Sequence, residues 1–300
     1  MDGDEELAAV MSERRQLLNV AYRLLGSLAD AEDVVQETYA RWYGLAERER
    51  AAVAAPGAWL TTVAGRICLD QLRSARARRE RYVGEWLPEP VPGDAGWFGG
   101  EADPADRVTL DESVSMAFLV VLDAMTPAER VAFVLHDVFR YSFAEVAAIV
   151  GRTPAACRQL AFSARRRLQR EVAPPPPADR RAGLVREFKR AWEARDIDAL
   201  LGLLDPAASL VADGGGRAEA ILQPVEGGGV IAEGVVRIAG LTPDMVLLEQ
   251  LVNGQPGLVA QVDGVTVTVF SFGFTGDRIS HIWAMRNPDK LGPWLEAPTP

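Results

Sequence analysis

The sequence predicts a multidomain protein in which two all-α domains, the second a helix-turn-helix, precede an α+β domain. Three observations carry this prediction. The chain has 300 residues, more than one average domain needs. Four consecutive prolines, residues 174–177, form a semi-rigid break after a helical half. Beyond them, two amphipathic helical stretches give way to alternating apolar and polar residues with hairpin turns.

A second break divides the helical half. Residues 83–107 are rich in Gly, Pro and Asp, which is typical of a linker. We therefore predict domains at residues 1–82, 108–172 and 180–300, with the proline-rich linker at residues 173–179.

The composition is that of a globular protein, with 48% apolar and 25% charged residues. No apolar run is long enough to cross a bilayer and the first residues are acidic, so we expect a soluble, cytoplasmic protein. Cys68 and Cys157 fall in predicted helices of different segments, which favours buried thiols over a disulfide or a metal site. With only two histidines, no metal and no cofactor are expected.

The distribution of charge favours a polyanionic partner, although the net charge is −10. Residues 152–170 hold six arginines and no acid, and residues 66–81 hold six arginines against two acids. One basic patch alone is as well explained by a solvated helix face. Two patches on separate helical units indicate a polyanion, such as nucleic acid, that is contacted at two places.

The first domain begins with an amphipathic helix around residues 14–25 and a second helix that we expect Asp30 to cap. Apolar residues of the second helix recur at three-and-four spacing and form one packing face. The polar residues lying away from that face make a compact acidic surface: Asp30, Glu32, Asp33, Gln36 and Glu37. A third helix opens near Pro56 and ends in a basic tail.

The second domain carries the helix start and stop signals of a helix-turn-helix. Residues 126–129 and 142–145 are capping boxes, each of which begins a helix. Gly151 can supply a left-handed C-cap, and Thr153-Pro154 opens the next helix almost at once. Two helices joined by a tight glycine turn predict a helix-turn-helix.

The last helix of this domain has an apolar side and a basic side. The basic side carries Arg158, Gln159, Phe162, Arg165 and Arg166, with Ser163 beside them. Arginine pairs with guanine and glutamine with adenine in the major groove, so this side predicts a DNA-recognition face. An ordinary helical hairpin with exposed arginines is the alternative.

In the third domain, Asn253-Gly254 and Asp263-Gly264 are strong hairpin signals, and the residues around them alternate in polarity. Helices followed by a curved antiparallel sheet fit an α+β cone.

The residues of the first two domains closely resemble a known family, the extracytoplasmic-function sigma factors. Residues 30–37, DAEDVVQE, resemble the helix by which these proteins bind core RNA polymerase. Residues 56–73 look like their next segment, which melts and reads the downstream −10 promoter element. Residues 122–168 resemble the domain that reads the upstream −35 element.

This resemblance implies an alternative sigma factor that binds core RNA polymerase and initiates transcription. Its DNA partner would be promoter DNA, double-stranded at −35 and single-stranded at −10. The acidic surface would bind the polymerase. The DNA-binding residues would be Arg66, Arg73, Arg76, Arg78, Arg79, Arg158, Gln159, Ser163, Arg165 and Arg166.

Three further motifs resemble a subgroup whose C-terminal extension has the SnoaL-like (NTF2-like) fold, which commonly encloses a cavity. They are Trp86-Leu-Pro-Glu-Pro90, Asp213-Gly-Gly-Gly216 and Asn287-Pro-Asp-Lys-Leu291; Arg217 stands where the family often has lysine. The resemblance implies control by the attached domain rather than by a separate anti-sigma protein. We expect a regulatory contact among Trp86, Leu87, Pro88, Asp213, Gly214, Gly215, Gly216, Asn287, Pro288, Asp289, Lys290 and Leu291.

SnoaL-like cyclases use an acid–base pair in their cavity, for which Asp213 and His281 are the candidates here. An aspartate before three glycines is more simply a turn, and His281 lies in an alternating strand, so no enzymatic activity is expected. The prediction leaves open whether the cavity binds a small-molecule ligand. Two alternatives remain, a one-component helix-turn-helix regulator with a ligand-sensing domain and a SnoaL-type enzyme fused to an inert helical region. Residues 30–73 discriminate against the regulator, which does not need them.

Overall fold

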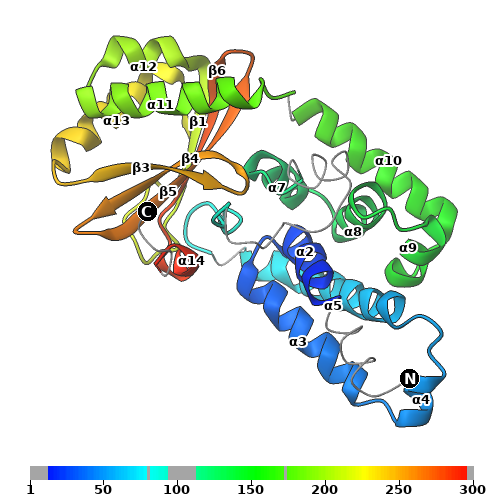
Figure 1. The fold of residues 1–300 in the computed structure, drawn as a ribbon. Coiled ribbons are helices and arrows are strands. Elements are labelled where there is room, and N and C mark those ends of the chain that lie inside the picture. Colours follow the sequence, from blue (N-terminus) through cyan, green and yellow to red (C-terminus); the bar gives the residue numbers. More distant parts are fainter. Residues whose placement is uncertain (1–12, 80–81, 94–112, 172–173, 296–300) are drawn as a thin grey trace. The chain divides into compact units, whose positions relative to one another are not determined.

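The computed structural model describes residues 13–79, 82–93, 113–171 and 174–295 (Figure 1). These residues form two compact units. The first unit is helical and contains residues up to 79 and residues 121–170. The second contains residues 82–93, 114–120 and 171 onward, so it includes the beginning of the predicted linker; residues 94–107 of that linker lie outside the described residues.

The first unit opens with α2 (Arg14–Leu25), α3 (Leu28–Tyr43), α4 (Glu47–Ala51) and α5 (Pro56–Arg79). Helix α2 has the predicted bounds and ends at Gly26, whose φ of 70° makes a left-handed C-cap. The prediction that Asp30 caps α3 is wrong. Ser27 is the N-cap, and its hydroxyl accepts a hydrogen bond from the Asp30 amide at 3.2 Å, which leaves Asp30 in the first turn.

The helix-turn-helix follows in the same unit. After α7 (Met116–Asp123) come α8 (Pro127–Phe133), a π-helical turn η1 (Val134–Val138), α9 (Phe143–Val150) and α10 (Pro154–Glu171). Both predicted capping boxes are confirmed, because Thr126 and Ser142 each form three hydrogen bonds with the glutamate three residues later. The turn at Gly151 is confirmed with φ of 70°. The π-helical turn was not predicted.

The second unit begins with α11 (Ala178–Ala194) and α12 (Ile197–Leu203). Its six-stranded sheet has the order β2-β1-β6-β5-β4-β3. The strands are β1 (Leu204–Asp213), β2 (Val225–Glu226), β3 (Val246–Val252), β4 (Gln255–Val262), β5 (Val265–Thr275) and β6 (Arg278–Met285). Helix α13 (Gly228–Leu241) connects β2 to β3, and η2 (Pro288–Lys290) and α14 (Gly292–Leu295) close the described chain.

Both predicted hairpins of this sheet are confirmed. Asn253, Gly254, Asp263 and Gly264 all have positive φ, as type I′ turns require. The expectation of an antiparallel sheet is wrong for one pair, since β1 and β6 are parallel. Strands β3 to β6 form an antiparallel meander, and its last strand returns beside β1 in the same direction.

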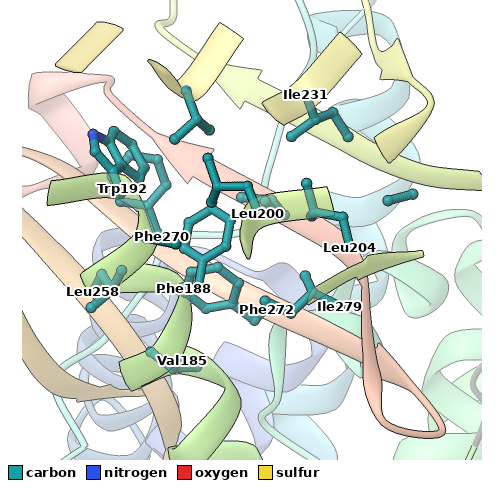
Figure 2. Packing of buried hydrophobic residues seen from close by; sticks show 14 of the residues in the cluster. Val185, Phe188, Trp192, Leu200, Leu204, Ile231, Leu258, Phe270, Phe272 and Ile279 are labelled. Carbon is teal, nitrogen blue, oxygen red and sulfur yellow. The ribbon is translucent and has the colours of Figure 1, made fainter. Parts of the chain in front are cut away.

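The two faces of the sheet are covered by different parts of the chain. Helices α11, α12 and α13 lie on one face (Figure 1). Aromatic rings fill that core: Trp192 and Phe188 of α11 each lie 5.4 Å, between ring centroids, from Phe270 and Phe272 of β5, respectively (Figure 2). The other face packs against Leu87 of the linker and Trp294 of α14. In the part of the chain that the structure describes, no helix has the length and apolarity needed to cross a membrane.

Candidate DNA-binding and linker-contact sites

Helix α10 separates an apolar and a basic side as predicted. Cys157, Ala161 and Ala164 are buried, while Arg158, Gln159, Phe162, Arg165 and Arg166 are exposed. The guanidinium of Arg158 lies 5.4 Å from the centroid of the Phe143 ring, and that of Arg166 lies 5.8 Å from Phe162. The first contact holds Arg158 against α9 and the second holds Arg166 along α10, while both arginines stay exposed.

Two of the candidate DNA-binding residues of α10 are engaged within their own domain. Ser163 donates a hydrogen bond to Glu129 at 2.9 Å, and Arg165 forms an ion pair with Asp137. Burial opposes ionisation of Glu129, but hydrogen bonds from Thr126 and Ser163 outweigh it and lower the pKa of that carboxyl group. Both side chains therefore have a partner within the domain.

Helix α5 presents its arginines differently. The exposed Arg66 donates to the backbone oxygen of Ala148 in α9 at 2.9 Å, and Arg73 pairs with Asp70 one turn earlier at 3.0 Å. The structure thus places Arg66 against the helix-turn-helix. Three further candidates belong to the end of α5, but their side chains lie outside the described residues: Arg76, Arg78 and Arg79.

The region of α5 around Arg66 packs closely on the helix-turn-helix. A Cβ added at Gly65 would lie only 2.9 Å from Cγ2 of Ile149. The hydroxyl of Tyr141 lies 2.9 Å from that of Thr61. In the first unit, the part of α5 around Arg66 is therefore packed against the helix-turn-helix.

The acidic surface of α3 is solvent-facing. Asp33, Gln36 and Glu37 are exposed, and Asp30 and Glu32 are partly buried. Glu37 pairs with Arg41 one turn on, in an exposed ion pair of the kind that contributes little to stability.

The three motifs of the second unit meet at the carboxylate of Asp213, which is 0% exposed. One oxygen accepts hydrogen bonds from the Tyr82 hydroxyl at 2.7 Å and the Gly215 amide at 3.0 Å. The other accepts from the Leu87 amide at 2.9 Å and from Nζ of Lys290 at 2.7 Å. One carboxylate therefore joins the linker, the glycine loop and the C-terminal tail.

Lys290 and Tyr82 extend this contact. Nζ of Lys290 also donates to the Leu87 carbonyl at 2.6 Å and lies 4.2 Å from the centroid of the Trp86 ring. The Tyr82 hydroxyl accepts a hydrogen bond from Asn287 at 2.8 Å. Burial and then the adjacent Asp213 carboxylate raise the pKa of Tyr82, so the phenol stays a hydrogen-bond donor at neutral pH.

The glycine loop requires glycine at the contact. A Cβ at Gly215, where φ is 59°, would lie 2.3 Å from Nδ2 of Asn287, and one at Gly216 would lie 3.0 Å from Val83. A Cβ at Gly214 would lie 2.4 Å from a backbone oxygen. Next to the loop, Arg217 pairs with Asp289 on the surface.

The linker continues along the edge of the sheet. The Gly93 amide donates to the Leu251 carbonyl at 2.9 Å, and Val91 exchanges hydrogen bonds with Asn253. The indole of Trp294 donates to the Pro90 carbonyl at 2.8 Å. Pro92 thereby forms one antiparallel bridge with Val252 at the end of β3, while Leu87 and Pro88 are buried.

Sequence reasoning missed three residues of this contact. Tyr82 carried no signal, and Trp294 stood out only as an aromatic residue near the end of the chain. Asn253 was interpreted as a turn residue alone, although its buried side-chain oxygen accepts from the linker. In each case the partner lies more than a hundred residues away in sequence.

Comparisons with known proteins bear on both helical regions. The family model for Sigma-70 region 2 matches residues 9–78, and that for Sigma-70, region 4 matches residues 115–168. The ECF RNA polymerase sigma factor SigJ of Mycobacterium tuberculosis is 38% identical over 305 residues, which covers 95% of this chain and 93% of SigJ. The chain belongs to the ECF RNA polymerase sigma factors. The probable ECF RNA polymerase sigma factor SigI of the same species is 34% identical, over an alignment that covers 97% of this chain and 96% of SigI.

The likeness extends over the C-terminal domain of this sigma factor. The crystal structure of SigJ from M. tuberculosis matches with a TM-score of 0.74 and 34% identity, and covers 96% of this chain and 98% of the other. The predicted fold class is thus confirmed: two helical sigma domains precede an α+β domain of the SnoaL-like type.

The C-terminal domain of the sigma factor holds a cavity of 590 Å³ between α11, α13 and the sheet. Ala212 and Ile282 line it, whereas Asp213 and His281 are their neighbours in sequence and point to the opposite face of β1 and β6. His281 stacks on Trp283, and desolvation lowers its pKa, so the imidazole is neutral at pH 7. The structure does not bring the two acid–base candidates together in the cavity.

Proposed function

We propose that this sigma factor binds core RNA polymerase, recognises promoter −35 and −10 elements and initiates transcription. We further propose that its fused C-terminal domain modulates this activity through the linker. The observation that carries the first part is the presence of both sigma regions in one chain, with a basic helix-turn-helix face exposed on α10.

On the DNA side, α10 would lie in the major groove of the −35 element. Arg158 and Gln159 are exposed, and their side chains carry the groups that pair with guanine and with adenine, respectively; Arg166 would contact phosphate. The basic end of α5 would contact the single-stranded −10 element, where a positively charged surface tracks the backbone. Before it could contact DNA, Arg66 would have to break its hydrogen bond to the Ala148 carbonyl.

On the polymerase side, the acidic surface of α3 is the proposed contact. Among its exposed members, Gln36 and Glu37 follow Asp33 by three and four residues, about one helical turn, so all three lie on one side of α3. They offer carboxylates and an amide to a basic partner surface. Because transcription takes place in the cytoplasm of bacteria, the proposed role implies a cytoplasmic protein.

The proposed regulation rests on the linker contact. Residues 82–93 lie between the two sigma regions in sequence, and the C-terminal domain holds them by the buried Asp213 carboxylate and by the edge of β3. Fixing this segment restrains the separation of the two sigma regions, so its release is a means of changing promoter output. We propose no catalysis for this domain, because Asp213 serves the linker contact.

A one-component regulator with a ligand-sensing domain is the second candidate, and the cavity is the observation that favours it. The region 2 match over residues 9–78 favours the sigma factor instead, since a simple regulator has no need of a polymerase-binding helix.

Reconstituted transcription tests the proposal. Sigma-free bacterial core polymerase and the full chain are supplied with a promoter library, and the transcripts are sequenced. We expect promoter-specific transcripts. Arg158→Ala should lower output by about fivefold to 150-fold at promoters that depend on the −35 element, since a bidentate base contact is worth about 1–3 kcal/mol.

The matched control is Arg190→Ala, which removes the same charge from an exposed position on α11 of the C-terminal domain. It should leave output unchanged. The proposal fails if the wild-type chain yields no specific transcripts across the library, or if both variants behave alike.

A further inference from the structure

The cavity of the C-terminal domain has the size of a small-molecule site. Its 590 Å³ lies within the range of roughly 300–1,000 Å³ that ligand pockets occupy. Most of its wall is apolar, including Phe188, Ile231, Val235, Phe270 and Ile282. An apolar wall of this extent favours a ligand with a substantial hydrocarbon or aromatic body.

Two buried donors on the wall lack an acceptor. Trp192 is 3% exposed, and its indole N–H has no hydrogen-bond partner among the described residues. Nε of Arg286 is likewise buried and without a partner there, although another nitrogen of the same guanidinium donates to the Glu219 carbonyl. Buried polar groups in folded proteins are nearly always paired, so an acceptor on a ligand that reaches either nitrogen would complete a hydrogen bond that the described residues do not supply.

The charges on the wall favour an anion. The charged residues among those lining the cavity are Arg237, Arg286 and Glu219, which gives one excess positive charge. Arg237 and Glu219 are exposed, whereas Arg286 is partly buried, where a charge interacts more strongly. A guanidinium in this setting pairs best with a carboxylate or another oxyanion.

We propose that the cavity binds a largely apolar small molecule that carries one anionic group, held by Arg286, and a further acceptor for the Trp192 indole. The ligand body contacts the aromatic wall of Phe188 and Phe270. The inference deepens the proposed regulatory role of the C-terminal domain and rests on it for its biological purpose. Binding itself is measured without transcription.

The fold provides a matched pair of variants. Gly234 of α13 lines the cavity, and a Cβ there meets nothing within 4 Å, so leucine at this position fills the cavity without displacing the wall. Gly240 belongs to the same helix, is exposed and also has open space around it. Leucine at either position replaces a helical glycine, so changes in helix propensity are matched.

The probes are 8-anilinonaphthalene-1-sulfonate, an apolar molecule with one anion, and N-phenyl-1-naphthylamine, the same skeleton without the anion. Fluorescence titration of the full chain should show one saturable site for each. Gly234→Leu should weaken both probes at least about tenfold, because the added side chain overlaps the site. Gly240→Leu should leave both affinities within about twofold, as exposed substitutions do.

Arg286→Met tests the anion contact. It should weaken the sulfonate probe at least about tenfold and leave the neutral probe within about twofold, because only the former loses a charge-assisted hydrogen bond. Circular dichroism confirms folding, and Ile238→Trp, which also fills the cavity, replaces Gly234→Leu if that variant does not fold.

Undiminished binding of both probes to the cavity-filled variant would overturn the inference, as would equal weakening of the two probes by Arg286→Met. A chain that directs transcription but binds neither probe would overturn it and leave the sigma activity standing. A chain that binds both probes but directs no transcription would reject the proposed function alone.

Discussion

Replacing Asp213 by asparagine is the sharpest test of the linker contact. The carboxylate is fully buried and accepts four hydrogen bonds, two from linker residues, one from its own loop and one from Lys290. The substitution keeps the shape of the side chain but removes its charge. The new amide group would also direct N–H donors at groups that are themselves donors.

The magnitude follows from the burial of the pair. Removing one partner of a buried ion pair costs about 3–5 kcal/mol, because the remaining charge stays desolvated. Lys290 is 12% exposed and keeps its contacts with the Leu87 carbonyl and the Trp86 ring. We therefore expect the lower end, ~3 kcal/mol, for the free energy of local opening of the linker.

Native-state hydrogen exchange measures this opening directly. The amides of Leu87, Val91 and Gly93 all donate within the contact, so they exchange only when the linker opens. A loss of ~3 kcal/mol predicts exchange about a hundredfold faster. The control is Asp289→Asn: this carboxylate is 57% exposed and pairs with Arg217, so its loss should accelerate exchange less than about fivefold.

Exchange that stays within about threefold of wild type in Asp213→Asn would refute the reasoning, since that factor corresponds to less than about 1 kcal/mol. The same conclusion would follow if Asp289→Asn had an equal effect, because an exposed and a buried carboxylate would then be equivalent.

Three further predictions concern the sigma domains. Thr126→Ala and Ser142→Ala should each lower the free energy of unfolding by ~1 kcal/mol in urea titrations, because each removes a capping hydroxyl; no loss would contradict the capping boxes. Hydrogen bonds from Ser142 lower the pKa of the Glu145 carboxyl group in the folded protein. The stability that the ionised carboxylate contributes is therefore fully present above the usual pKa of 4.5, and it is lost as the pH falls through the lowered pKa of the folded state. The Ser142→Ala loss should thus be larger at about pH 7 than at about pH 3, and an equal loss would reject the pKa assignment. Burial raises the pKa of the Cys68 and Cys157 thiols, so iodoacetamide should label neither at about pH 8 before unfolding, and rapid labelling of the native chain would contradict their burial.

Local features of the fold were predictable where their causes are local. The capping boxes at Thr126 and Ser142 involve residues three apart, and the hairpin turns at Asn253-Gly254 and Asp263-Gly264 follow from residues that tolerate positive φ. The cap of α3 was misassigned because two polar residues, Ser27 and Asp30, both suit an N-cap. Only the structure shows that Ser27 is the residue with extended, non-helical backbone angles.

Features that depend on distant partners were not predictable from pattern. Helix α13 begins at two glycines and contains two more, which weakens any helical signal. The parallel pairing of β1 with β6 joins residues about seventy positions apart. The resemblance to a family subgroup, rather than periodicity, indicated that Trp86, Asp213 and Lys290 meet; Tyr82, Asn253 and Trp294 had no such motif to reveal them.

Transcription with core polymerase, comparing the wild-type chain with Asp213→Asn and Asp289→Asn, tests the central claim most directly. The account predicts promoter-specific transcripts from all three. It also predicts a change of at least about threefold in output for Asp213→Asn alone, whose direction reports whether the held linker restrains or assists initiation. Absence of specific transcripts from every chain would contradict the assignment as a sigma factor. Equal output from all three would contradict control through the linker.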